Sequence, residues 1–197
     1  MKWVYFVFTL LAIYFVFQSF MPISSLYTEK QKYRKVASFS DFEIRFYPSA
    51  TFATVYSSAT NYKSLASNGF RKLAGFIFGG NKQNESIAMT APVRMRMSEK
   101  GSSMSFVMPE KYDSKALPTP NNTEVNIQKS EPQYVAVISF GGYASDDKIK
   151  AYNEKLVQIL NKKNIKIKGP FSFLGYNAPF QFIGRTNEII IPIEWKE

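Results

Sequence analysis

The feature that most constrains the fold of this chain is a weak repetition of its first half in its second half. Glu43-Ile44-Arg45 is followed by Ala53-Thr54-Val55-Tyr56, and Glu124-Val125-Asn126 is followed at the same spacing by Tyr134-Val135-Ala136-Val137. Each half then contains an Ala-Pro pair and an apolar run that ends in proline: Ala91-Pro92 and Phe106–Pro109 in the first, Ala178-Pro179 and Ile189–Pro192 in the second. Four matches in the same order indicate a tandem duplication, and we expect each half to form a βαββ-like unit.

Two segments have the periodicity of amphipathic helices. The first runs from about Asn61 to Phe78, with Thr60 placed to cap its start and Gly79-Gly80 to end it. The second runs from about Asp146 to Lys163, with Ser145 as its cap. Because the remaining pattern consists of runs of strands, we expect an α+β domain in which an antiparallel sheet or barrel carries both helices on its outside.

The N-terminal residues 1–24 are predicted to form a separate apolar segment. The stretch from Trp3 to Phe17 is apolar apart from Thr9, and with Phe20 and Met21 it approaches the roughly 20 residues that cross a bilayer. A single lysine ahead of such a run also describes a signal peptide. We therefore expect a membrane-anchored protein with one transmembrane segment, or an exported one if the segment is cleaved. Residues 25–35 are predicted to be a basic stalk, and residues 36–197 the folded domain.

The chain contains no cysteine and no histidine. This absence excludes disulfides, thiolate nucleophiles, Cys/His zinc sites, imidazole general bases and the commonest haem ligand. An enzyme would have to rely on carboxylates and tyrosines such as Glu43, Glu188 or Tyr176, and no pattern pairs them, so we expect a non-catalytic protein. The net charge of +10 is scattered along the chain. Scattered charge argues against nucleic-acid binding and leaves anionic small molecules or lipid headgroups as partners.

Several motifs in register carry a family resemblance. In the first half they are Glu43–Tyr47, Phe70–Leu73 with Ile77–Asn81, Ile87–Val93 and Phe106–Pro109, and in the second half Gly175–Pro179 and Arg185–Ile189. In order and spacing these motifs resemble the SOUL haem-binding family over nearly all of residues 33–195. The resemblance implies a distorted antiparallel β-barrel of two similar halves with two flanking helices. Bacterial effector-binding domains look like relatives on the same scaffold.

The resemblance also implies a function, which is binding of haem or a related tetrapyrrole in a shallow hydrophobic cleft for transport, buffering or sensing. Some family members offer a histidine in the segment that matches Glu43–Tyr47, but this chain has Phe46 there. Axial ligation by imidazole is therefore excluded. Two alternatives remain open: a binding module for other amphiphilic or aromatic small molecules, as in effector-binding domains, and a protein-interaction domain that needs no ligand.

The candidate ligand-binding residues follow from the same resemblance. Tyr47 and Met89 are candidates for iron ligands. The candidates for an apolar floor are Phe70, Leu73 and Ile77, those for the ligand carboxylates are Arg45, Lys63 and Arg71, and Tyr176 is a candidate hydrogen-bond donor. Each also has a structural interpretation, because the three apolar residues lie at core spacing and the cations are equally suited to ion pairs or solvent.

Overall fold

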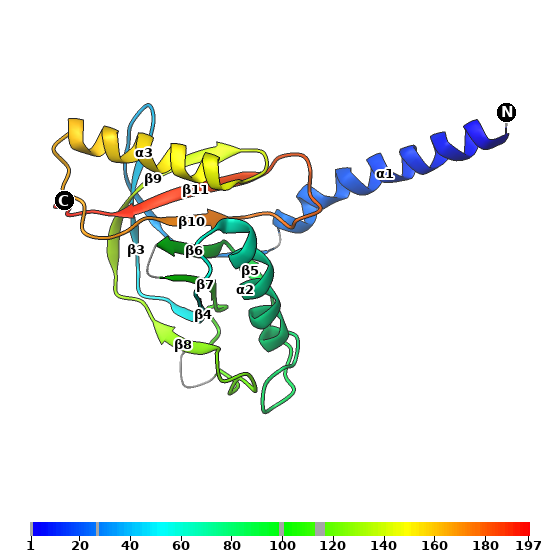
Figure 1. The fold of residues 1–197 in the computed structure, drawn as a ribbon, viewed down its shortest axis with the longest axis horizontal. Coiled ribbons are helices and arrows are strands. Elements are labelled where there is room, and N and C mark those ends of the chain that lie inside the picture. The colour runs from blue at the N-terminus through cyan, green and yellow to red at the C-terminus, as the bar shows by residue number, and fades with distance from the viewer. Residues whose placement is uncertain (1, 27, 99–100, 113–116) are drawn as a thin grey trace.

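The computed structural model describes residues 2–26, 28–98, 101–112 and 117–197, which form three helices and eleven strands (Figure 1). The helices are α1 (Lys2–Leu26), α2 (Tyr62–Ile77) and α3 (Asp146–Lys162). The strands are β1 (Glu29–Lys30), β2 (Arg34–Ser38), β3 (Glu43–Tyr47), β4 (Thr51–Ser57), β5 (Thr90–Ala91), β6 (Val93–Ser98), β7 (Gly101–Val107), β8 (Asn126–Lys129), β9 (Gln133–Gly141), β10 (Ser172–Gly175) and β11 (Thr186–Pro192).

Nine of these strands form one antiparallel sheet in the order β2-β3-β9-β11-β10-β6-β7-β4-β8, and β1 pairs with β5 in a short parallel ladder beside it. The α+β class is as expected. The predicted barrel is not observed, because the edge strands β2 and β8 do not pair with each other. Closure requires every strand to have two neighbours, so the sheet is a curled half-barrel with two open edges.

The duplication is visible in the topology. The first half contributes β3, β4, α2, β6 and β7, and the second contributes β8, β9, α3, β10 and β11, so each half is ββαββ and not βαββ. The first strands are exchanged: β3 pairs with β9 of the other half, and β8 pairs with β4. One of the four sequence matches was wrong, since Ala91-Pro92 leads into β6 whereas Ala178-Pro179 follows β10.

Helices α2 and α3 have the predicted extents within one or two residues. The Asn61 side chain caps α2 by accepting a hydrogen bond from the Ser64 amide at 2.9 Å, so the cap is one residue later than the predicted Thr60. Ser145 caps α3, as predicted. Both helices cover the same surface of the sheet (Figure 1), because their buried leucines share one core cluster with alternate strand residues.

Strand alternation gives the sheet two chemically different surfaces. We call the surface under α2 and α3 the helix face and the opposite surface the open face. In β11, Ile189 belongs to the core cluster on the helix face, whereas Glu188 and Ile190 lie on the open face. In β6, Met95 joins the helix-face core, and Arg94 therefore belongs to the open face.

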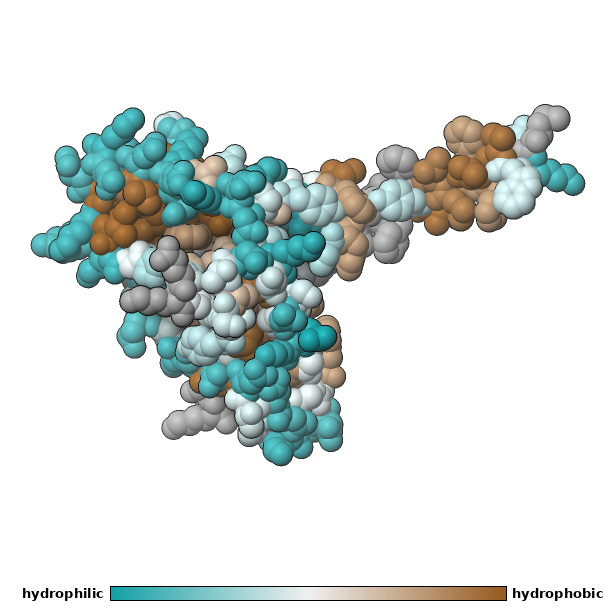
Figure 2. All heavy atoms as spheres, in the orientation of Figure 1, coloured by the Kyte–Doolittle hydropathy of each residue, from teal (hydrophilic) through white to brown (hydrophobic). Residues whose placement is uncertain are grey.

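Helix α1 extends away from the domain in Figure 1, and its described apolar side chains, among them Trp3 and Phe6, are exposed (Figure 2). Met1 lies outside the described residues. Among the residues that are described, no helix combines the length and the apolarity that crossing a bilayer requires, and the predicted transmembrane segment is thus not supported. Part of the predicted stalk lies in strands, because β1 and the start of β2 fall within residues 25–35.

Candidate functional site

A cleft of about 470 Å³ lies between helix α2 and the loop that joins β10 to β11. Helix α2 supplies one wall, with Tyr62, Lys63, Ala66, Ser67, Phe70 and Arg71. The sheet supplies Val93, Met95, Phe173, Gly175 and Asn187, and the loops supply Tyr143, Ala144, Asn177, Pro179 and Arg185. The volume lies within the range of roughly 300–1,000 Å³ that is usual for small-molecule sites.

Aromatic rings give the cleft rigid apolar surfaces. Tyr62 packs edge-to-face against Phe173, with ring centroids 5.4 Å apart and an interplanar angle of 82°. Phe70 packs against Phe106 at 5.4 Å, and 36% of Phe70 remains exposed. Because Phe173 and Phe106 are buried, both pairs hold their outer rings in place. Fixed flat rings suit a planar aromatic ligand at low cost in conformational entropy.

The β10–β11 loop is held in place by its own hydrogen bonds. Arg185 Nη1 donates to the carbonyl oxygens of Ala178 and Gln181, each at 2.7 Å. The Arg185 guanidinium also lies over the Tyr143 ring, 4.4 Å from its centroid, and the Tyr143 hydroxyl donates to the carbonyl of Pro179 at 3.3 Å. The second wall of the cleft is therefore an ordered loop with a cation built into it.

The charges that line the cleft are all positive. Lys63, Arg71 and Arg185 are among the lining residues, and the described lining contains no aspartate or glutamate. Burial raises the pKa of the Tyr62 phenol, which the nearby Arg185 opposes, so this hydroxyl is neutral at neutral pH. The cleft therefore combines aromatic surfaces with an excess of cations, which is the arrangement that an apolar ligand carrying carboxylates requires.

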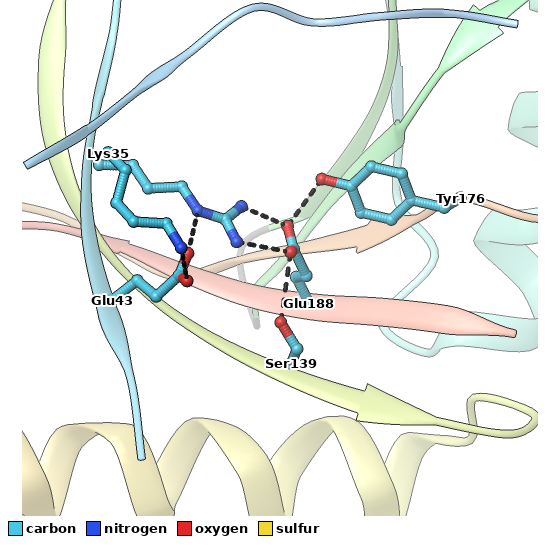
Figure 3. Close-up of polar contacts among 6 residues, drawn as sticks. Lys35, Glu43, Ser139, Tyr176 and Glu188 are labelled. Carbon is cyan, nitrogen blue, oxygen red and sulfur yellow. Dashed lines mark hydrogen bonds and ion pairs between the residues drawn. The ribbon is translucent and has the colours of Figure 1, made fainter. Parts of the chain in front are cut away.

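A second polar group is buried on the open face, where Arg45 and Glu188 form a bidentate ion pair with both N–O distances at 3.0 Å (Figure 3). The Tyr176 hydroxyl donates to Glu188 Oε2 at 2.7 Å, and the Ser139 hydroxyl donates to Oε1 at 3.3 Å. Arg45 Nε donates to Glu43 at 2.8 Å. Every nitrogen of the guanidinium thus has a carboxylate partner within the chain.

The Arg45 guanidinium at the centre of this open-face cluster is fully satisfied, whereas the Tyr47 hydroxyl beside it is buried without a hydrogen-bond partner among the described residues. Burial would lower the pKa of Arg45, but hydrogen bonding and charge attraction to Glu188 outweigh it and raise that pKa. Burial and the charge of Glu188 raise the pKa values of Tyr47 and Tyr176, so both phenols stay protonated at neutral pH. A protonated phenol is a poor iron ligand compared with a phenolate. The cluster therefore links β3, β9 and β11 and has no nitrogen of Arg45 left for a ligand.

The comparison with known families decides the classification. The sequence model described as SOUL heme-binding protein matches residues 28–192. The chain belongs to the SOUL heme-binding family. Heme-binding protein 2 of Mus musculus is 30% identical over 159 residues, covering 75% of this chain and 76% of the mouse protein. Heme-binding protein 2 of Homo sapiens is 28% identical over 158 residues, with the same coverage of 75% and 76%.

Solved structures with little sequence identity share the fold of this SOUL-family chain. The C-terminal domain of EcmrR superposes with a TM-score of 0.60 at 12% identity, covering 83% of this chain and 99% of that domain. The structure of SAV2435 bound to tetraphenylphosphonium superposes with a TM-score of 0.50 at 10% identity, covering 78% of this chain and 94% of that one. These likenesses show that the half-barrel is a scaffold common to proteins of divergent sequence.

The structure divides the predicted site residues of this SOUL-family chain into three groups. Lys63, Phe70 and Arg71 line the cleft. Three others pack elsewhere on the helix face: Leu73 and Ile77 lie in the core, with 0% and 1% of their surface exposed, and Met89 is partly buried against that core. The last three, Arg45, Tyr47 and Tyr176, lie across the sheet on the open face. The residues predicted from the sequence as one site therefore lie on both faces of the sheet, the helix face and the open face.

Sequence reasoning missed the cleft residues that come from loops and strands. Tyr143 and Arg185 were not singled out as ligand-binding residues, although both belong to the cleft. Arg185 belongs to the Arg185–Ile189 motif of the family resemblance, and this position in a motif is the sequence signal that points to it. Nothing in the local pattern showed that this arginine lies near helix α2, because the two segments meet only in the folded sheet.

Proposed function

We propose that this protein binds haem or a related tetrapyrrole in the cleft between α2 and the β10–β11 loop, without catalysis, for transport, buffering or sensing. The observation that carries the proposal is the combination of flat aromatic walls with three cations and no carboxylate in the described lining. A porphyrin has a large apolar face and two propionates, which match these two features. Membership of the SOUL heme-binding family supports the same ligand class.

The lining residues fit the porphyrin better than they fit its iron. Tyr62, Phe70 and Phe173 would contact the ring, and the cations of the cleft would hold the propionates. Bound iron would supply redox chemistry, but the chain has no imidazole or thiolate with which to ligate it. The thioether of Met95, which lines the cleft, is the soft donor that remains there. Affinity is therefore governed by ring burial and propionate contacts.

We expect hemin and iron-free protoporphyrin to bind the full-length chain with one-to-one stoichiometry and dissociation constants within about tenfold of each other. The reason is that the cleft offers ring contacts and cations to both, and no strong iron ligand to either. The measurement is a titration that follows the Soret band and tryptophan quenching. A site built on iron ligation would bind hemin far more tightly, and no saturation with either compound would contradict the proposal.

We expect the double variant Lys63→Gln, Arg71→Gln to weaken protoporphyrin binding by about tenfold, because both cations are exposed and each exposed charge pair is worth up to about 1 kcal/mol. Binding of protoporphyrin dimethyl ester, which lacks the carboxylates, should change little in the same variant. The control is Lys150→Gln, Lys155→Gln, which removes two exposed cations from α3 outside the cleft. Equal weakening by the control would show that net charge, and not the cleft, attracts the ligand.

The second candidate ligand class is other amphiphilic or aromatic molecules. One structure that shares the fold is bound to tetraphenylphosphonium, a lipophilic cation. The charges of this cleft disfavour such a ligand, since Lys63, Arg71 and Arg185 would repel it. Within this class the cleft therefore favours anionic amphiphiles, and a competition titration of bound protoporphyrin with an alkyl carboxylate would show whether the site accepts them.

A further inference from the structure

A second pocket, of about 240 Å³, lies on the open face. Strand alternation separates it from the cleft: Val93 and Met95 line the cleft, whereas Arg94 and Arg96 of the same strand line this pocket. Lys129 is a third cation in its lining, and Glu131 is the carboxylate there. Glu131 is exposed and makes no ion pair with any of the three cations among the described residues.

Arg94 is the unusual member of this pocket. Its Nε is buried and has no hydrogen-bond partner in the described part of the chain. Its Nη2 donates to a neutral acceptor, Gln31 Oε1, at 3.1 Å, and its guanidinium lies over the Phe52 ring at 4.8 Å. Burial, with Arg96 acting in the same direction, lowers its pKa to about 10, which still leaves it charged at neutral pH. Arg45, by contrast, has two carboxylates.

A chain of hydrogen bonds along the wall of the same pocket ends at the Ser105 hydroxyl. The Tyr56 hydroxyl donates to Gln128 Oε1 at 3.2 Å, and Gln128 Nε2 donates to Thr54 Oγ1 at 3.0 Å. Thr54 Oγ1 lies 2.9 Å from Ser105 Oγ. Either hydroxyl of the Thr54–Ser105 pair can be the donor. When Thr54 donates to Ser105, the Ser105 proton is free to donate to a ligand.

We propose that this open-face pocket binds a small oxyanion, a carboxylate or phosphate group, held by the guanidinium of Arg94 with Arg96, Lys129 and the Ser105 hydroxyl. A partly buried guanidinium without a carboxylate partner is costly unless an anion compensates its charge. Guanidinium groups match the geometry of carboxylate and phosphate oxygens with two donors at once. The site is independent of the tetrapyrrole cleft, because the sheet separates the two.

The test is calorimetric titration of the full-length chain with inorganic phosphate and with malonate, at an ionic strength held constant with sodium chloride. We expect saturable one-to-one binding of at least one anion, and the stronger binder identifies the oxyanion class. Arg94→Gln should raise the dissociation constant by about tenfold or more. Lys162→Gln, which removes an exposed cation from α3, should leave it unchanged.

Absence of saturable binding by both anions would overturn the proposal, as would equal affinity in Arg94→Gln or equal weakening in Lys162→Gln. If Arg94→Gln does not fold, Arg96→Gln and Ser105→Ala replace it, and unchanged affinity in both would be decisive against the site. Protoporphyrin binding should be the same in Arg96→Gln as in the wild type. That comparison keeps this proposal distinct from the function proposed for the cleft.

Discussion

Glu188→Gln is expected to lower the free energy of unfolding by about 3–5 kcal/mol, the usual cost of removing one partner from a buried ion pair. The substitution keeps the side-chain volume but leaves Arg45, whose side chain is 6% exposed, without its bidentate carboxylate. Glu43 remains as a single, more exposed partner. The measurement is equilibrium denaturation by urea, with the midpoint and the slope compared between variant and wild type.

The control for this prediction is Glu194→Gln. Glu194 pairs with Lys166 at 3.0 Å, and the two side chains are 43% and 75% exposed. Exposed pairs contribute little to stability because water screens them. The two substitutions have the same chemistry and differ in burial. Equal effects of the two substitutions on the free energy of unfolding would show that the buried Arg45–Glu188 pair stabilises the sheet no more than an exposed pair does.

Ser67→Trp is expected to abolish tetrapyrrole binding, or to weaken it by about a hundredfold, with little change in stability. Ser67 lines the cleft from an exposed position of α2, so an indole there would occupy the space of the porphyrin ring without entering the core. A ligand that buries most of its surface in one cleft cannot bind there when a protein side chain fills that cleft. The measurements are the Soret titration with protoporphyrin and, in parallel, denaturation by urea.

The matched control is Asn68→Trp, which places the same side chain at the next residue of α2, exposed but outside the cleft lining. Full binding by Asn68→Trp together with loss of binding by Ser67→Trp would locate the ligand in the cleft. Retained binding by a folded Ser67→Trp protein would move the tetrapyrrole elsewhere on the molecule and would leave the cleft without its proposed ligand.

The elements that depend on local pattern could be predicted from the sequence. Helix α3 has its Ser145 cap and its apolar spacing within one continuous segment, and the structure confirms both. The structure also confirms the duplication, because each half repeats the same order of strands around one helix. Family motifs in register predicted the SOUL relationship. These signals are carried by residues close to one another in the chain, where backbone geometry alone relates them.

Tertiary structure decided the rest. Whether the sheet closes depends on its edge strands β2 and β8, and no local pattern specifies that they remain unpaired. Arg45 and Glu188 are 143 residues apart in sequence, and their pairing follows from the exchange of the first strands between the halves. The cleft depends on the same long-range order, since it brings Arg185 of the β10–β11 loop to the wall opposite Arg71 of α2. Sequence periodicity assigns a side chain to one face of its own element, but only the packing of distant elements determines which side chains share a site.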